Sequence, residues 1–247
     1  MKYFSLIALL ISAGLGISQK AKPTVSETPS LFDAGTVSAL KFRSIGPALT
    51  SGRVADLAIH PDNKDVWYVA AASGGVWVTR NHGTTFSPIF DGYGSYSIGC
   101  VRIAPSNPKT IWVGTGENNN QRSASYGDGV YKSVDGGKTF VNMGLKQSEH
   151  IGTIVIHPKN ENILWVAAYV PLWSSGGERG VYKSVDGGKT WKRTLFVSEN
   201  TGIAEVQIDP IHPDILYASA HQRRRHEWTY IGGGPESTVY KSVDGGE

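Results

Sequence analysis

The sequence repeats one unit four times, and this repeat restricts the possible folds more than any other feature. Each unit opens with a short apolar run that ends at a proline: Pro61, Pro105, Pro158 and Pro210. A second run follows, with an aromatic residue six or seven positions after the proline: Trp67, Trp112, Trp165 and Tyr217. A third run carries the aromatics Trp77, Tyr131, Tyr182 and Tyr240, and a fourth run carries Phe86, Phe140 and Trp191 nine residues later.

Four short runs in every unit of about 44 to 58 residues are typical of β-propeller blades. A helical solenoid is excluded, because no unit keeps an apolar period of about 3.6 over the roughly ten residues that a helix needs. We predict an all-β protein, a β-propeller of four-stranded antiparallel blades at about residues 51–91, 97–145, 150–196 and 202–247. The fourth unit's last aromatic would fall at position 249, beyond Glu247. We therefore expect an incomplete propeller of about four blades, the remainder being missing from this chain.

The connection between the third and fourth runs reads SVDGGKTF at 133–140, SVDGGKTW at 184–191 and SVDGG at 242–246. The aspartate can accept backbone N–H bonds across such a turn, the paired glycines supply positive φ, and the following aromatic folds back between strands. The first unit has a divergent copy, TRNHGTTF, with Asn81 in place of the aspartate. One copy per unit favours structural turns over calcium binding or catalysis, so no metal site is predicted. The predicted structural residues are Ser133, Asp135, Gly137, Thr139, Phe140, Ser184, Asp186, Gly188, Thr190, Trp191 and Asp244.

These turns resemble the Asp boxes of the sialidase/BNR superfamily. The segments FRSIGPALTSGRVADLAIHP, GTGENNNQRS and HQRRRHEWTYIGGG resemble large exported bacterial proteins described as sortilin-like or as BNR-repeat glycosyl hydrolases, and the resemblance covers about residues 38–247. It implies a propeller that binds a ligand or a protein, or that cleaves glycosides. Xyloglucan-cleaving propeller glycosidases carry an aspartate where this chain has Ala72, and Ser44 and Gly46 break the sialidase Phe-Arg-Ile-Pro motif.

Glycoside cleavage needs two carboxyl groups facing each other across the scissile bond, about 5 to 9.5 Å apart. Glu117 and Glu227 are the weak catalytic candidates among the few acidic residues of the connecting loops. We therefore favour a binding module without evident catalytic machinery in this segment. The alternative is a glycoside hydrolase acting on extracellular polysaccharide.

Insertions are confined to the connection between the second and third runs, where the aromatic residues are 10, 19, 17 and 23 positions apart. Variable loops mark the functional face of a repeat protein. Amides and guanidinium groups beside aromatics in these loops suit a carbohydrate or peptide ligand, although polar residues can also simply solvate long loops. The predicted ligand-binding residues are Glu117, Asn118, Asn119, Arg122, His221, Arg223, Arg224 and Trp228.

The N-terminus has a signal-peptide pattern, in which Met1 and Lys2 precede an apolar stretch at 3–17 and small residues follow. We expect a signal peptide at 1–18, a polar linker at 19–37, a secreted or periplasmic location and no membrane span after cleavage.

The net charge of +3 is too diffuse for nucleic-acid binding, and the arginine run at 223–225 is interpreted as part of a loop. A single cysteine, Cys100, excludes an intrachain disulfide and is expected to be a small buried apolar residue, and no cofactor is expected.

Overall fold

The structure, a computed structural model, describes residues 52–119, 124–169 and 171–247. The chain separates into two units, Met1–Gly46 and Pro47–Glu247, and every described strand belongs to the second. The predicted signal peptide, the linker and the start of the repeat region lie outside the described residues. Within the described ranges there is no helix long and apolar enough to cross a membrane.

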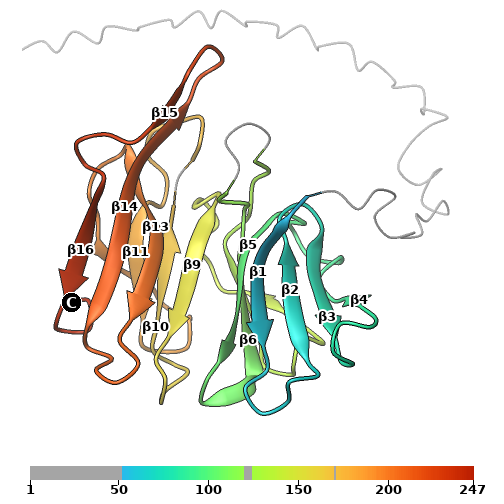
Figure 1. Ribbon diagram of the computed structural model, residues 1–247. Coiled ribbons are helices and arrows are strands. Elements are labelled where there is room, and N and C mark those ends of the chain that lie inside the picture. Colours follow the sequence, from blue (N-terminus) through green and yellow to red (C-terminus); the bar gives the residue numbers. More distant parts are fainter. Residues whose placement is uncertain (1–51, 120–123, 170) are drawn as a thin grey trace, which may run out of the picture. The chain divides into compact units, whose positions relative to one another are not determined.

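The strands form four antiparallel sheets of four strands each, which we call blades one to four (Figure 1). Blade one contains β1 (Val54–Ile59), β2 (Trp67–Ala71), β3 (Gly75–Thr79) and β4 (Ser87–Pro88). Blade two contains β5 (Ile98–Ala104), β6 (Asn107–Thr115), β7 (Val130–Ser133) and β8 (Val141–Asn142). Blade three contains β9 (Ile151–Ile156), β10 (Leu164–Ala168), β11 (Gly180–Ser184) and β12 (Lys192–Leu195). Blade four contains β13 (Thr201–Ile208), β14 (Leu216–Arg225), β15 (Tyr230–Gly232) and β16 (Thr238–Ser242).

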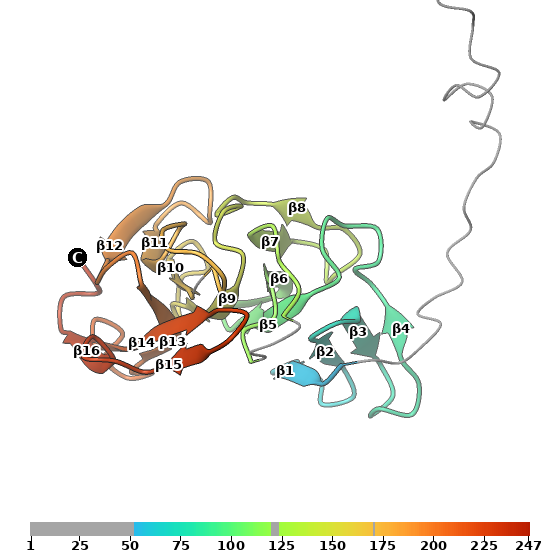
Figure 2. The same ribbon diagram turned by 90° about the horizontal axis from the view of Figure 1, so that it is seen from above.

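The blades are arranged as in a β-propeller, which confirms the predicted fold class. Their first strands contact one another in chain order, β1 with β5, β5 with β9 and β9 with β13. The last strands of blades one to three, β4, β8 and β12, lie at the outer edges (Figure 2). Apolar side chains from each pair of neighbouring blades fill the space between them and form three clusters. Cys100 is buried in the second cluster, where burial raises the pKa of its thiol to about 12.

Blade four departs from the other three in its strand order. The third strand of its repeat is β16, which pairs with Leu216–Ala220 of β14, whereas β15 pairs with the far end of β14 at Arg223–Arg225. The β14–β15 hairpin projects beyond the rest of the blades in Figure 1. The interpretation of the arginine run as a loop was therefore wrong. The arginine run is the last part of β14, and it pairs with Tyr230–Gly232 of β15. No turn signal in the sequence predicts this pairing.

The aromatic position of β2 was also misassigned in the sequence. Ala58 pairs with Tyr68 in blade one, as Val155 pairs with Trp165 in blade three, so Tyr68 and not Trp67 is the equivalent residue. Tyr68 is buried between blades one and two, and its hydroxyl donates a 3.1 Å hydrogen bond to the Gly136 carbonyl. A shift of one residue exchanges the two faces of a strand. The correct spacing from the proline is seven residues in all four units.

The Asp-Gly-Gly turns that follow β7, β11 and β16 share one hydrogen-bond pattern. In blade two, Ser133 Oγ accepts from Gly137 N–H at 2.9 Å, and the Asp135 carboxylate accepts from the Thr139 N–H at 2.9 Å and from its hydroxyl at 2.6 Å. These donors, the hydroxyl first, hold the pKa of Asp135 well below its usual range. Ser184, Asp186 and Thr190 repeat the arrangement in blade three, and Ser242 and Asp244 repeat its first part in blade four.

Each of these turns also contacts the preceding blade. A β-carbon at Gly188, whose φ is +88°, would lie 2.3 Å from the Trp112 ring, so this ring packs directly on the turn backbone. Trp165 Nε1 donates a 3.1 Å hydrogen bond to the Gly245 carbonyl in the same way. The turns therefore join neighbouring blades as well as closing their own hairpins.

Candidate functional site

The β14–β15 hairpin separates the predicted ligand-binding residues onto two faces. Side chains alternate along a strand, so His221, Arg223 and Arg225 point to one side of β14 and Gln222 and Arg224 to the other. Adjacent arginines in the sequence thus have different surroundings. The side with Gln222 and Arg224 opens to solvent as a pocket, whereas Arg223 on the other side is buried.

Arg223 lies on the closed side and links three blades. Its guanidinium donates a 2.7 Å hydrogen bond to the Asn118 carbonyl of blade two and lies 5.1 Å from the ring centre of Tyr169 in blade three. The Tyr169 hydroxyl is hydrogen-bonded to His221 Nδ1, and the two rings stack at 5.9 Å. A buried cation over an aromatic face stabilises packing. Arg223 and His221 therefore position the hairpin rather than present free groups to a ligand.

His150 lies close to this cluster, between blades two and three. It is buried, and neither ring nitrogen has a hydrogen-bond partner within the described part of the chain. Burial, and then the nearby Arg223 charge, lower the pKa of His150 to about 3, so its ring is neutral near pH 7. The sequence analysis missed this residue, because a single histidine before the apolar run IGTIVI carries no motif.

The residues predicted in the loop after β6 also connect blades. The Glu117 carboxylate is buried, forms an ion pair with Arg53 of blade one and accepts from the Ser73 hydroxyl at 3.4 Å. Asn119 Oδ1 accepts from Arg53 Nε at 3.0 Å, and Asn118 Nδ2 donates to the Gly152 carbonyl at 2.8 Å. Arg122 lies outside the described residues. A buried, paired carboxylate holds its neighbours in place and is not available as an acid toward a ligand.

The open side of the hairpin forms a pocket of about 320 Å³. It is lined by Asn200, Gln222, Arg224, His226 and Ile231. One terminal nitrogen of Arg224 donates to Asn200 Oδ1 at 2.9 Å, whereas Arg224 Nε and Gln222 Oε1 are buried without a hydrogen-bond partner among the described residues. The pocket therefore holds a cation and amide groups with unused hydrogen-bonding capacity, and no carboxylate lines it. Of these five residues, Arg224 alone is among the predicted ligand-binding residues, and Asn200 and Ile231 join the hairpin only through the fold.

The hairpin tip carries an aromatic pair beside this pocket. Trp228 is 81% exposed and stacks on His226 at 5.3 Å with an interplanar angle of 13°. Glu227, the second catalytic candidate, is exposed at the same tip. In the described ranges no group of three or more His, Cys, Asp or Glu residues could hold a metal ion.

No protein-family model and no curated protein matches the sequence. Solved structures match the fold. The GH74 enzyme of Niastella koreensis is 24% identical with a TM-score of 0.57, over 77% of this chain and 28% of that enzyme. The GH74 xyloglucanase of Xanthomonas campestris is 18% identical with a TM-score of 0.58, over 77% of this chain and 28% of its own.

An ancestral GH74 enzyme is 20% identical with a TM-score of 0.57, over 72% of this chain and 23% of its own. This chain thus spans less than a third of the length of each of these three enzymes. At such identities the likeness concerns the fold, and the described chain is a set of β-propeller blades similar to those of GH74 enzymes.

Proposed function

We propose that this chain is a ligand-binding propeller module of an exported protein, and that the pocket of the β14–β15 hairpin recognises a carbohydrate. The observation that carries the proposal is the lining of this pocket, in which the Arg224 guanidinium and the Gln222 and Asn200 amides lie near the exposed Trp228 ring. A few polar groups that line a pocket orient a ligand by exchanging hydrogen bonds with it.

The chemistry of the pocket suits a sugar better than an apolar ligand. Sugars present hydroxyl groups to amides and guanidinium groups, and their apolar faces stack on aromatic rings such as the Trp228–His226 pair. An extended peptide could use the same donors and acceptors, so peptides belong in the test as a competing ligand class.

The proposal also includes the type of repeat and the export of the protein. The shared hydrogen bonds of the Asp-Gly-Gly turns support their identification as Asp boxes of the BNR type, within a sortilin-like exported protein. Export rests on the sequence of residues 1–18. N-terminal sequencing of the mature protein tests it: we expect a start near Gln19, and an intact Met1 on protein from the cell envelope would contradict cleavage.

Glycoside hydrolysis is the second candidate function, supported by the fold likeness to GH74 enzymes. The ion pair of Glu117 with Arg53 speaks against this carboxylate as a proton donor. Incubation with polysaccharides, followed by measurement of released reducing ends, tests hydrolysis. Activity that disappears in both Glu117→Gln and Glu227→Gln would establish an enzyme.

The binding test starts from glycan and peptide arrays probed with the chain, followed by calorimetry on the best glycan. Arg224→Ala and Trp228→Ala should each weaken binding about tenfold or more, equivalent to about 1.4 kcal/mol. Lys138→Ala and Lys189→Ala, exposed side chains of the Asp-Gly-Gly turns, are the matched controls and should leave the affinity unchanged. Loss of binding in the lysine variants alone would place the site on the turns instead.

A further inference from the structure

Two tyrosines, Tyr96 and Tyr126, are exposed on neighbouring connections between strands. Tyr96 belongs to the connection between β4 and β5, and Tyr126 belongs to the connection between β6 and β7. The two residues are 62% and 54% exposed, and the Tyr96 hydroxyl is hydrogen-bonded to the Ser125 hydroxyl at 3.3 Å. We call Tyr96 and Tyr126 the tyrosine pair. Single exposed apolar residues are common, but two aromatic residues on adjoining loops indicate a contact surface.

Buried hydroxyl groups fix the backbone beneath the tyrosine pair. Ser95 and Ser97, on either side of Tyr96, are 7% and 0% exposed. The Ser95 hydroxyl donates to the Tyr126 carbonyl at 2.9 Å, and the Ser97 hydroxyl donates to the Ser125 carbonyl at 2.8 Å. The two loops are therefore held together in the free protein, and a ligand does not have to order them when it binds.

Tyr126 is also supported by a buried ring. The ring of His150, which is 1% exposed, lies 5.8 Å from the Tyr126 ring centre at an interplanar angle of 56°. Part of the Tyr126 ring thus packs on the protein while the rest remains open to solvent. A tyrosine in this position presents an apolar ring and a polar hydroxyl, which suits the apolar face and hydroxyl groups of a sugar.

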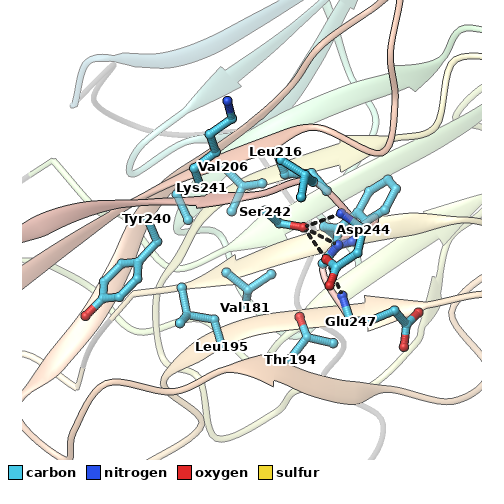
Figure 3. Close-up of a pocket in the computed structure, with 14 residues that line it drawn as sticks. Val181, Thr194, Leu195, Val206, Leu216, Tyr240, Lys241, Ser242, Asp244 and Glu247 are labelled. Carbon is cyan, nitrogen blue, oxygen red and sulfur yellow. Dashed lines mark hydrogen bonds between the residues drawn. The ribbon is translucent and has the colours of Figure 1, made fainter.

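The exposure of the tyrosine pair does not depend on the groove between blades three and four. That groove, of about 310 Å³, is lined by residues that include Val181, Leu195 and Leu216 (Figure 3). It lies where the repeat continues, since the next aromatic of the pattern would fall at position 249. The tyrosine pair instead lies on connections of blades one and two, and Phe140 is buried in the cluster between these blades.

The tyrosine pair and the hairpin pocket lie at the same end of the blades. The connection between β6 and β7 contains Tyr126 and also Asn118, whose carbonyl accepts a 2.7 Å hydrogen bond from Arg223 of β14. Arg223 directly precedes Arg224, which lines the pocket. The loop that carries one half of the tyrosine pair therefore contacts the strand that forms the pocket.

Two further aromatic residues are exposed on connections of the same type. Trp173, between β10 and β11, is 41% exposed, and Trp228, between β14 and β15, is 81% exposed. The Leu172 carbonyl accepts a 2.8 Å hydrogen bond from the Arg225 N–H, which places the Trp173 loop beside the hairpin. Exposed rings thus occur on the connections of each blade from one to four.

We propose that the tyrosine pair is a second contact site for the glycan of the hairpin pocket, so that the ligand is a polysaccharide chain rather than a single terminal sugar. This inference rests on the proposed function. The pocket donates and accepts hydrogen bonds, and the tyrosine rings stack on sugars further along the chain. Two contacts on one chain strengthen binding beyond either contact alone, because the second becomes intramolecular once the first has formed.

The test measures how affinity depends on the length of the glycan. Oligosaccharides of the best glycan from the arrays, from a disaccharide upward, are titrated into the whole chain by calorimetry. The longer oligosaccharides should bind at least tenfold more tightly than the disaccharide. Tyr96→Ala and Tyr126→Ala should remove most of this gain and leave the affinity for the disaccharide unchanged, whereas Arg224→Ala should weaken binding at every length.

Two control variants separate stacking from a structural role. Phe86→Ala removes a ring that is 44% exposed in the turn between β3 and β4, at the opposite end of the blades, and should change neither affinity. Tyr96→Trp keeps an aromatic ring at the site and should preserve the affinity for long oligosaccharides. Circular dichroism checks that all variants fold.

The outcomes distinguish this inference from the proposed function. Equal affinities for short and long oligosaccharides, or a gain with length that survives both tyrosine-to-alanine substitutions, would overturn the second contact site and leave the hairpin pocket in place. Failure of every glycan to bind would overturn both. If arrayed peptides bind instead and Tyr126→Ala weakens their binding at least tenfold, the ligand is a peptide and the polysaccharide assignment is wrong.

Discussion

Equivalent residues of the repeat have different surroundings in the inner blades and in blade four. Trp112 and Trp165 are 0% and 2% exposed, but Tyr217 at the same position of blade four is 44% exposed. Val130 and Val181 are 0% and 5% exposed, and the corresponding Val239 is 68% exposed. The side chains are similar in size and polarity, so the difference comes from whether a following blade covers the sheet. Each repeat unit therefore buries these side chains only through contact with a neighbouring blade.

The largest expected difference is between two losses of stability, one on removing the aromatic side chain of Trp165 in β10 and the other on removing that of Tyr217 in β14. Trp165→Ala should lower the free energy of unfolding by about 3–5 kcal/mol, because it leaves a cavity between two packed blades. Tyr217→Ala should cost about 1 kcal/mol or less, because water already reaches this ring. Urea denaturation followed by tryptophan fluorescence and circular dichroism measures both. Equal costs would mean that burial between blades does not determine stability here.

A pH dependence provides the second test of the inner interfaces. The pKa of His150 falls from 6.5 to about 3 on folding, so the unfolded chain binds a proton between these values that the folded chain does not. Stability should therefore fall as the pH falls below 6.5, by up to about 1.4 kcal/mol per pH unit from this group.

The variant His150→Phe should remove this contribution to the dependence of the free energy of unfolding on pH, because phenylalanine fills the buried space without titrating. His226→Gln on the blade four hairpin is the control and should keep the slope, because His150 is still present. Denaturation at a series of pH values from 7 to 5 compares them. An unchanged slope in His150→Phe would show that other groups dominate.

The open face of blade four should promote self-association of the chain. Val239→Lys should raise the monomer fraction several-fold at micromolar concentrations, because it places a charge on an exposed apolar sheet face. Val134→Lys is the matched control: Val134 is about equally exposed but lies on the tip of a turn. Sedimentation velocity distinguishes them, and equal monomer fractions in the two variants would exclude this face as the contact.

The smallest effect concerns the turn of blade one. Asn81 Oδ1 accepts from Thr85 N–H at 2.9 Å, as the Asp135 carboxylate does from Thr139, but the Asn81 amide donates to the Thr85 hydroxyl instead of accepting from it. Asn81→Asp should raise the melting temperature by about 1–2 °C at pH 7.

The depressed pKa of Asp135 gives the sign of this change with pH. A carboxylate held in this way stabilises the fold above its unfolded pKa of 3.8, and the stabilisation is lost as the pH falls below that value. The gain from Asn81→Asp should therefore begin to shrink as the pH falls below 3.8 and continue to shrink toward the depressed folded-state pKa, which differential scanning calorimetry can follow. A gain that does not decline at all as the pH falls below 3.8 would have to come from something other than ionisation.

Much of the fold could be predicted from the sequence, because strand runs, turn residues and their spacing are local properties. The adjacent aromatics Trp67 and Tyr68 show where such local properties are not sufficient. Both residues fit the pattern, and only the pairing of Ala58 with Tyr68 determines which one faces the next blade. The β15 strand was missed for a related reason, since its partner is the unusually long end of β14.

The candidate site was predicted less completely. Arg224 and Trp228 were named from composition, and they lie at the open hairpin. Glu117 was named for the same reason, but its buried ion pair with Arg53 comes from another blade, 64 positions earlier in the chain. No local pattern separates a polar residue that meets a ligand from one that holds two blades together.

The sequence by itself determined the blade count of this chain, its antiparallel strands and its Asp-Gly-Gly turns, because these depend on periodicity and on backbone preferences within one unit. The tertiary structure alone decided which aromatics are buried and which arginine of the run faces the pocket. Those outcomes depend on contacts between blades. A residue's burial and charge environment are set by atoms that lie many positions away in the chain, and the repeat places similar side chains in different surroundings.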